Sequence, residues 1–179
     1  MEDGMYWYVF DTKPNSTTEM LGFLNRQANI EAFIPRVEKY FKCSGFEGFQ
    51  LKDMYPGYIF IKTSLNESEF KNEYFDFLKT VKRLGKILEK DEFIALSNDE
   101  IDTLSRLFDE SNLIRHSCGK YNGNELVIYE GPLKGFEKNV KKINRHKKIA
   151  EVGFEFLGKE MMLPLEVINK KGSALYDTR

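Results

Sequence analysis

Short apolar runs with the composition of β-strands recur through the first half of the chain. They are rich in aromatic and β-branched residues and are separated by Pro, Gly, Asn and Ser, the residues that typically break strands. The runs cover residues 5–10, 30–35, 37–43, 46–51 and 55–62, with a weaker one at 82–88. Only Ser44-Gly45 separates the third run from the fourth, so this pair predicts a protruding β-hairpin.

Three helices are predicted between these strands. Apolar residues at helical spacing follow Ser16, Asn66 and Ser97, and each of these polar residues has a glutamate three positions later. That spacing is typical of a capping box, which marks the start of a helix. The order of strands and helices predicts an α+β domain with an antiparallel sheet over residues 1–110.

The second half of the chain has a different pattern. Residues 111–124 are polar and glycine-containing, which predicts a linker. From residue 125 onward only short strands are indicated, and residues 150–156 alternate between apolar and other side chains. We therefore expect a small β-barrel over residues 125–170, followed by a frayed tail at 171–179.

Charge is divided unevenly between the two halves. The net charge is −1 and the hydrophobic fraction is 41%, enough for packed cores. Residues 113–179 hold 13 Lys and Arg against 8 Asp and Glu, whereas the other 112 residues hold 14 against 20. This asymmetry indicates two parts with different partners, the second of which favours a polyanion.

The cations of the second half are concentrated after the turn Gly131-Pro132-Leu133-Lys134-Gly135. Seven Lys and Arg and a single acid, Glu137, lie between Lys134 and Lys148. A solvated surface loop is one interpretation. Nucleic-acid binding is favoured, because charges that flank a β-turn can reach one phosphate backbone together. The candidate RNA-binding residues are Lys138, Lys141, Lys142, Arg145, His146, Lys147 and Lys148.

The kind of nucleic acid follows from the shortage of aromatic residues in this region. Only Tyr129 and Phe136 accompany the cations, and proteins that bind single strands usually stack several bases on aromatic rings. Structured or duplex RNA is therefore favoured over a stacked single strand. Arg145 and His146, at the tip of the predicted turn, are placed to touch base edges.

Aromatic residues gather on two strands of the first half that we expect to be neighbours. Trp7 lies on the first strand, and Tyr55, Tyr58 and Phe60 lie on or beside the fifth. Such residues form either part of the core or a surface that binds a partner protein. The sequence leaves both possibilities open.

Enzymatic and metal-dependent functions find no support in the sequence. The chain has no Gly-rich phosphate loop, nucleophile elbow or HExxH motif. Cys43, Cys118, His116 and His146 lack the spacing of zinc ligands, so we expect reduced thiols, no metal and no cofactor. Without an apolar run of membrane-spanning length or a signal peptide, we expect a soluble, cytoplasmic, monomeric protein.

Several segments together resemble the NusG family of transcription elongation factors along most of the chain. The order and spacing of the segments carry this resemblance. They are Trp7-Tyr8-Val9, Phe33-Ile34-Pro35-Arg36, Tyr55-Pro56-Gly57-Tyr58-Ile59-Phe60-Ile61, residues 130–140 and Phe156-Leu157-Gly158. The resemblance implies an N-terminal NGN domain and a C-terminal KOW domain, which is an SH3-like barrel. Residues 143–148 look most like those of the LoaP antiterminators, which bind an RNA hairpin in the leader of long operons.

The resemblance also implies partners. The NGN domain would bind the clamp helices of the largest RNA polymerase subunit through Trp7, Tyr55, Pro56 and Tyr58. In ordinary members the KOW domain meets ribosomal protein or termination factor, often through a Phe where this chain has Leu133.

Two departures from the usual family pattern concern nucleic acid. The segment that meets non-template DNA in general members is replaced by one containing Lys82 and Arg83, which would touch DNA phosphates. Lys138 stands where a glycine is usual, and this added cation favours RNA over protein partners.

The predicted function is therefore bacterial transcription antitermination. The N-terminal domain would bind RNA polymerase, and the KOW domain would bind a structured leader RNA. The main alternative is a general elongation factor that couples polymerase to the ribosome or to termination factor through protein contacts. A ribosomal interaction module is a more distant alternative.

Overall fold

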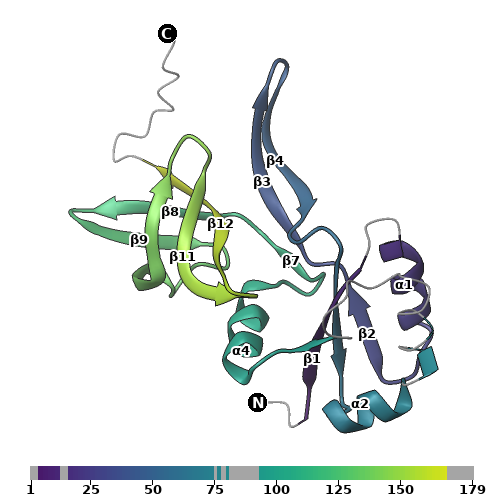
Figure 1. Ribbon diagram of the computed structural model, residues 1–179. Coiled ribbons are helices and arrows are strands. Elements are labelled where there is room, and N and C mark those ends of the chain that lie inside the picture. Colours follow the sequence, from purple (N-terminus) through teal and green to yellow (C-terminus); the bar gives the residue numbers. More distant parts are fainter. Residues whose placement is uncertain (1–3, 13–15, 75, 78–79, 81–92, 169–179) are drawn as a thin grey trace. The chain divides into compact units, whose positions relative to one another are not determined.

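The aromatic run near the N-terminus forms an interior strand of a four-stranded sheet in the computed structural model (Figure 1). The strand order is β2-β5-β1-β6, and every pairing is antiparallel. The strands are β1 (Tyr6–Asp11), β2 (Ile30–Phe33), β5 (Tyr58–Thr63) and β6 (Ile94–Ala95). The predicted α+β class is confirmed, as are the strands expected at residues 5–10, 30–35 and 55–62.

The structure describes residues 4–12, 16–74, 76–77, 80 and 93–168. The chain divides into two units, and both are discontinuous in sequence. The N-terminal unit comprises Met1–Arg36 and Asp53–Ser105, and the C-terminal unit comprises Val37–Lys52 and Arg106–Arg179. The predicted boundary at residue 110 misses the hairpin, which belongs with the C-terminal unit. The weak strand expected at 82–88 and the tail at 171–179 lie outside the described residues.

The helices begin close to the predicted capping residues. They are α1 (Thr17–Leu24), α2 (Glu67–Glu73) and α4 (Asn98–Leu107). Asn66 and Ser97 accept hydrogen bonds from Glu69 and Glu100 main-chain N–H groups, and the glutamates accept in return, so these two capping boxes are confirmed.

The third predicted capping box is absent. Ser16 has helical rather than extended backbone angles, and among the residues that the structure describes its side chain caps no N–H. The hydroxyl of the next residue, Thr17, instead lies 2.8 Å from that of Thr12. An N-cap normally has an extended conformation, which aims its oxygen at the first turn.

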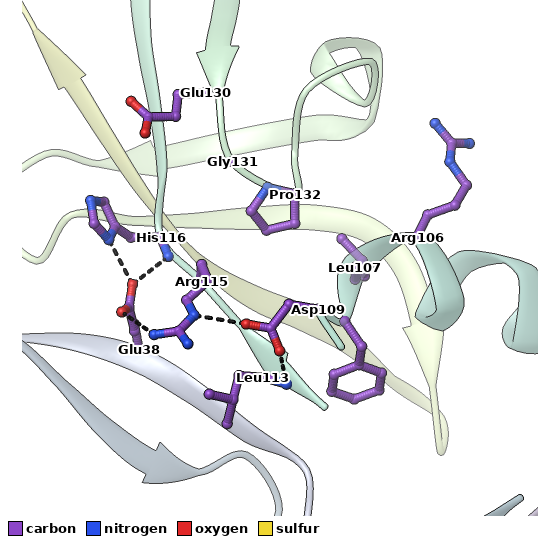
Figure 2. A pocket seen from close by; sticks show the side chains of 11 residues that line it. Glu38, Arg106, Leu107, Asp109, Leu113, Arg115, His116, Glu130, Gly131 and Pro132 are labelled. Atoms are coloured by element: carbon purple, nitrogen blue, oxygen red, sulfur yellow. Dashed lines mark hydrogen bonds and ion pairs between the residues drawn. The ribbon is translucent and has the colours of Figure 1, made fainter. Parts of the chain in front are cut away.

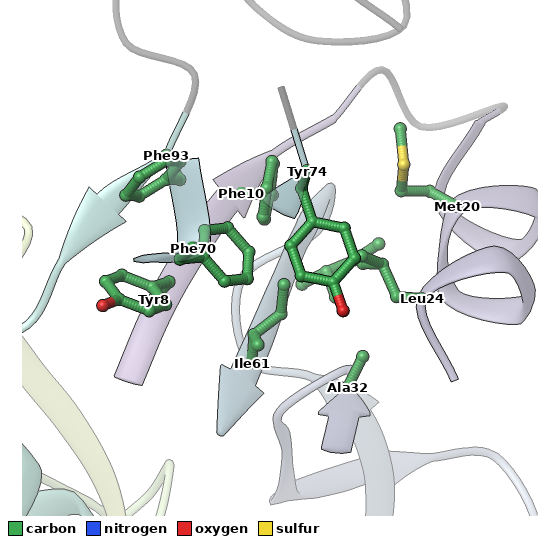
Figure 3. Packing of buried hydrophobic residues seen from close by; sticks show 10 residues of the cluster. Tyr8, Phe10, Met20, Leu24, Ala32, Ile61, Phe70, Tyr74 and Phe93 are labelled. Atoms are coloured by element: carbon green, nitrogen blue, oxygen red, sulfur yellow. The ribbon is translucent and has the colours of Figure 1, made fainter. Parts of the chain in front are cut away.

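The core of the N-terminal unit lies between one face of the sheet and helices α1 and α2 (Figure 3). Tyr8, Phe10 and Ile61 project from the strands, and Phe70 meets them from α2. The rings of Tyr8 and Phe70 have centroids 4.7 Å apart. Burial of large apolar side chains is the main stabilising contribution to such a unit.

The predicted hairpin forms the first part of the C-terminal unit. It consists of β3 (Arg36–Cys43) and β4 (Phe46–Asp53), joined at Gly45 with a φ of 84°. A short strand, β7 (Leu113–Ile114), pairs with the other edge of β3, in the order β4-β3-β7. The hairpin is thereby tied to a segment more than sixty positions later in the chain.

A five-stranded sheet with the order β10-β11-β12-β8-β9 makes up most of the C-terminal unit. Its strands are β8 (Ser117–Asn122), β9 (Glu125–Glu130), β10 (Val140–Asn144), β11 (Ile149–Phe156) and β12 (Lys159–Ile168). The segment 111–124, predicted to be a linker, instead contains β7 and β8. The prediction of a linker was wrong because it relied on polar composition. β8 is a strand because it pairs with β12 on one side and β9 on the other. Among the described residues no pairing joins β9 to β10, so closure into a barrel stays a prediction.

The Gly-Pro turn after β9 is fixed by close packing. Gly131 has a φ of 93°, and a Cβ there would lie 2.5 Å from the Cα of Ser117. Ser117 is buried, and its hydroxyl accepts a hydrogen bond of 3.0 Å from the Leu133 N–H. Leu133 is itself fully buried. A side chain larger than hydrogen at Gly131 would therefore displace β8.

Candidate functional sites

A tight turn precedes β5 and carries the aromatic residues of the N-terminal unit. We call residues Tyr55–Tyr58 the aromatic turn. The Tyr58 N–H donates a 3.1 Å hydrogen bond to the Tyr55 carbonyl, with Pro56 and Gly57 between them. Gly57 has a φ of 91°, so the turn has the sequence and geometry of type II. A Cβ at Gly57 would lie 2.8 Å from the Thr12 carbonyl oxygen, which makes glycine necessary.

The aromatic turn presents an uncharged surface. The rings of Tyr55 and Tyr58 have centroids 6.0 Å apart at 65°, both are half-buried, and Pro56 is exposed. Burial raises the pKa of Tyr55 to about 12. Burial, and then the neighbouring Asp11 carboxylate, raise the pKa of Tyr58. Both phenols therefore stay protonated at neutral pH and can take part in apolar contacts and hydrogen bonds with a partner.

Trp7, which we expected to bind a partner directly, is a core residue. Its side chain is 5% exposed and meets Phe33 edge-on, with 6.0 Å between the centroids. Lys62 Nζ lies 5.0 Å from the Trp7 ring and 4.8 Å from the Phe33 ring. Phe60 is fully buried as well. Neighbouring strands are buried on both faces, so alternation alone could not identify which aromatics reach the surface.

The predicted basic residues lie on and around the turn between β10 and β11. We call residues Asn144–Lys148 the basic turn. Asn144 Oδ1 accepts a 3.0 Å hydrogen bond from the Lys147 N–H, and the Lys148 N–H donates to the Arg145 carbonyl at 3.3 Å. The Lys148 carbonyl accepts a 3.0 Å hydrogen bond from Leu165 of β12. These bonds fix the backbone of the turn against the sheet.

Six of the seven candidate RNA-binding side chains are exposed and the seventh is half-buried. The exposed six are Lys138, Lys141, Lys142, Arg145, His146 and Lys147, and the seventh is Lys148. The predicted set is therefore spread along β10. Arg145, His146, Lys147 and Lys148 lie in the turn that joins β10 to β11, whereas Lys138 precedes β10 and Lys141 lies beside Gly153 of β11, away from that turn. All of the set but Lys148 are exposed to a ligand.

The local positive charge is smaller than the sequence run indicates. Lys141 forms an ion pair with Glu160, and Lys148 Nζ lies 2.7 Å from Glu166 Oε1. Both acids come from β12, which is distant from the run in sequence but near it in the fold. Lys142 also stands opposite Glu151 in the register of β10 and β11. Paired lysines contribute less to a polyanion site than their number predicts.

Aromatic rings hold two of these cations near the turn. The Arg145 guanidinium lies 5.5 Å from the Tyr121 ring of β8. Lys148 Nζ lies 4.3 Å from the Tyr40 ring and 5.7 Å from the Phe49 ring, both on the hairpin. These distances are within the range of cation–π contacts, which reduce the freedom of long side chains before a ligand binds.

A pocket of about 530 Å³ lies where β3, the end of α4 and the segment after β7 meet (Figure 2). Glu38 of β3 accepts hydrogen bonds from the His116 main-chain N–H at 2.7 Å and from Arg115 at 3.3 Å. His116 Nδ1 lies 2.6 Å from the same carboxylate. Arg115 Nε also donates to Asp109 at 2.8 Å.

Glu38 fastens the hairpin to the rest of the C-terminal unit. Partial burial raises the pKa of Glu38, but the hydrogen bonds from His116 and Arg115 outweigh burial and hold the pKa below its ordinary value. The His116 ring stacks on Phe49 of β4, with centroids 4.1 Å apart at 9°. The sequence carried no signal for this cluster, because its members are separated by up to 78 positions.

Comparison with known proteins decides the family. The family model described as "Transcription termination factor nusG" matches residues 5–105, more than half of the chain. This chain belongs to the NusG family. A curated relative, the transcription termination/antitermination protein NusG of Haemophilus influenzae, is 24% identical over 139 residues. The matched part is 76% of this chain and 72% of that protein, so the likeness extends past residue 105.

Membership places the protein among transcription termination and antitermination factors. The match to the NusG family model includes the aromatic turn and stops before the basic turn. The predicted resemblance to the family is thereby confirmed, whereas the narrower resemblance to LoaP antiterminators remains a prediction.

The other sequence predictions for this NusG-family chain concern DNA contacts, metal ligands, cysteines and membrane spans. Lys82 and Arg83, the candidate DNA contacts, lie outside the described residues. Within the described ranges, no three His, Cys, Asp or Glu residues are grouped as metal ligands. Cys43 is an exposed free thiol and Cys118 a half-buried one. No described helix combines the length and apolar character needed to cross a membrane.

Proposed function

We propose that this chain is a bacterial transcription antitermination factor that binds RNA polymerase and a structured leader RNA at separate sites. The N-terminal unit binds the clamp helices of the largest polymerase subunit and disfavours the paused enzyme. The C-terminal unit binds the RNA, and the protein acts as a monomer. Because one chain carries both sites, binding at one raises the effective concentration at the other.

The main support for the polymerase-binding site comes from the aromatic turn. It lies within the region that matches the NusG family model, and Gly57 fixes its backbone by close packing on Thr12. Exposed Pro56 and the two protonated tyrosines form a preorganised, neutral surface. Such surfaces favour protein partners over nucleic acid, since aromatic residues are enriched in protein interfaces. Trp7 is not part of this surface, because it is buried opposite Lys62 whereas Tyr58 stands opposite Asp11, at the other end of β1.

The basic turn supports RNA as the second ligand. Arg145, His146 and Lys147 are exposed on the turn itself, and exposed Lys138 and Lys142 lie before β10 and along it. Three to five phosphate contacts there give a logarithmic salt dependence with a slope of roughly −0.7 to −0.9 per contact. Lys82 and Arg83 add contacts to the phosphates of non-template DNA.

The alternative is a general elongation factor in which the C-terminal unit binds ribosomal protein or termination factor. For this unit we propose the SH3-like KOW fold, with the five strands curved toward closure. Leu133, at the position where the resemblance implies a contact residue, is fully buried beneath the Gly-Pro turn. A buried side chain offers no surface to a protein partner, which favours RNA as the ligand of this unit.

A crossed pair of variants tests the two sites. Tyr58→Ala should weaken polymerase binding by at least ten-fold, about 1.4 kcal/mol, and leave RNA affinity unchanged. The double variant Arg145→Ala/Lys147→Ala should lose about 1–3 kcal/mol of RNA affinity and keep polymerase binding. The measurements are polymerase pull-down and gel-shift titration with hairpins from the leader RNAs of the native cell.

Two controls complete the design. Tyr58→Phe keeps the ring and should bind polymerase nearly as well as the original chain, provided that the ring makes the contact. Circular dichroism reports whether Tyr58→Ala stays folded. RNA binding that is weak, identical for every hairpin and insensitive to the double variant would support the general elongation factor instead.

A further inference from the structure

A cleft within the C-terminal unit lies beside the basic turn and has no role in the functions described so far. It measures about 300 Å³, the lower end of the ~300–1,000 Å³ typical of ligand pockets, so it suits one small planar group. Strand β3 of the hairpin forms one wall and the basic turn forms the other, with β12 contributing as well. The residues used below are Lys39, Tyr40, Phe41, Lys147, Lys148 and Met162.

Strand β3 is longer than β7, the strand that pairs with the edge away from β4. β3 spans eight residues, whereas β7, its partner on that edge in the described chain, spans two. Much of the edge therefore presents main-chain N–H and C=O groups that β7 cannot pair. Main-chain donors and acceptors of this kind can recognise the edge of a nucleobase.

Charge at the cleft favours a ligand that carries phosphate. Lys39, Lys147 and Lys148 line it, with Lys148 also paired with Glu166 of β12, and Glu38 is the acid among the lining residues. The Glu38 carboxylate is engaged by Arg115 and by the His116 N–H, which reduces its repulsion of an anion. The lysines lie on both walls, so a phosphate near the cleft mouth can meet cations from either side.

The aromatic wall is preorganised. The Tyr40 hydroxyl donates a 2.5 Å hydrogen bond to Glu47 of β4, and the Tyr40 ring meets Phe49 edge-on at 5.7 Å. Lys148 has a φ of 47°, a conformation that is uncommon for a residue other than glycine. This backbone places Lys148 Nζ 4.3 Å from the Tyr40 ring. Strain of this kind often marks a functional position.

Met162 supplies a polarisable apolar surface to the cleft. It lies on β12, and its side chain is 47% exposed although it is large and apolar. Methionine adapts to planar ligands through its flexible thioether. A ring or base that enters the cleft would cover Met162 and remove apolar area from water.

We propose that this cleft binds one unpaired nucleobase of the RNA held by the basic turn. The base lies against Tyr40 and Met162, and its phosphate lies near Lys147 and Lys148. The proposal rests on the proposed RNA binding and adds a subsite that distinguishes an RNA with an unpaired base from a continuous duplex. It makes the hairpin, part of the region matched to the NusG family model, a contributor to RNA recognition.

The test uses the full-length chain and two blunt-ended RNA duplexes, identical except that one carries a bulged 2-aminopurine. The original chain should bind the bulged RNA more tightly and quench its fluorescence, because the fluorescent base stacks on an aromatic ring. Tyr40→Ala should lower the affinity for the bulged RNA by about five- to 150-fold, the range expected for base–aromatic stacking. Its affinity for the continuous duplex should stay within about two-fold.

Matched variants separate the cleft from the hairpin as a whole. Tyr40→Phe keeps the ring and should keep both the preference and the quenching. Phe46→Ala removes an exposed aromatic ring from the same hairpin outside the cleft and should change neither. Met162→Ala should weaken the preference without disturbing the hairpin, so it tests the cleft even if Tyr40→Ala unfolds.

Three results would overturn the proposal. Equal affinity of the original chain for both RNAs would leave RNA binding intact and remove the subsite. Loss of polymerase binding by Tyr40→Ala with unchanged RNA binding would assign the β3 edge to a protein strand. Failure to bind either RNA would remove the proposed RNA function as well as the subsite.

Discussion

The aromatic turn and the basic turn each hold a ligand-binding backbone in one conformation, but different interactions fix them. Each is a tight turn beside a sheet, and each contains a residue with positive φ, Gly57 in the first and Lys148 in the second. Gly57 packs against the Thr12 carbonyl, so the first turn is fixed by close packing. The second is fixed by hydrogen bonds and by cations placed over Tyr40 and Tyr121.

This difference explains how one chain can bind two different ligands selectively at two sites. A neutral surface fixed by packing should be insensitive to salt and sensitive to changes of shape. A charged surface should tolerate changes of shape and respond strongly to ionic strength. The predictions below use these opposite sensitivities, beginning with the largest effect.

The largest effect is expected on the free energy of unfolding, when a methyl group is added to the aromatic turn. Gly57→Ala places a Cβ 2.8 Å from the Thr12 carbonyl at a φ of 91°. The free energy of unfolding should fall by about 2–4 kcal/mol, from backbone strain and overpacking together. Gly45→Ala is the matched control, with a φ of 84° and no atom within 4 Å of the added Cβ. It should cost about 1–2 kcal/mol. Equal losses in urea denaturation would contradict close packing at Gly57.

Salt should distinguish the two turns almost as strongly. Between about 50 and 200 mM salt, RNA binding with three to five phosphate contacts should weaken by roughly 20- to 500-fold. Polymerase binding through the aromatic turn should change far less. The measurement is the affinity for each ligand, titrated with the same protein across this salt range. A steep salt dependence for both would indicate that one charged surface binds both ligands.

Acid should loosen the hairpin of the C-terminal unit through Glu38. Its pKa is held below the ordinary value of 4.5, so its stabilising effect is complete above that pH and is lost as pH falls through the lowered pKa. Glu38→Gln should cost about 1–2 kcal/mol at neutral pH, because the charge-assisted hydrogen bonds are weakened. The difference from the original chain should shrink below pH 4.5. The measurement is the free energy of unfolding against pH, with Glu125→Gln as the control for one lost charge.

The smallest effect concerns Glu160, which lies at the start of β12, away from the basic turn. Glu160 pairs with Lys141, and Glu160→Gln would release that lysine for phosphate contacts. RNA affinity at low salt should rise by about two- to five-fold, because an exposed ion pair is weak and screened by solvent. Glu125→Gln, at an exposed position of β9, should change the RNA affinity less. Weaker RNA binding by Glu160→Gln would place the RNA away from Lys141.

Local sequence signals predicted the secondary structure well. The run at residues 5–10, the hairpin around Gly45 and the capping boxes at Asn66 and Ser97 depend on near neighbours, and all are present. Ser16 differs because its backbone is helical instead of extended. Where a motif depends only on residues within one turn, the sequence is a sufficient guide.

Features that depend on distant residues were not predictable in the same way. Burial of Trp7 depends on Phe33 and Lys62, and the ion pairs of Lys141 and Lys148 depend on β12. The attachment of the hairpin to the C-terminal unit likewise depends on contacts made across the fold. No pattern within one segment reports these contacts, since the fold alone brings their members together.

The most direct test is transcription in vitro through a terminator placed downstream of a leader hairpin taken from the native cell. We expect the original chain to increase read-through only when the hairpin is present. Tyr58→Ala and Arg145→Ala/Lys147→Ala should each lose most of this effect, because the two sites act together. Read-through that is independent of the hairpin and unchanged in the double variant would contradict recruitment by RNA at the basic turn.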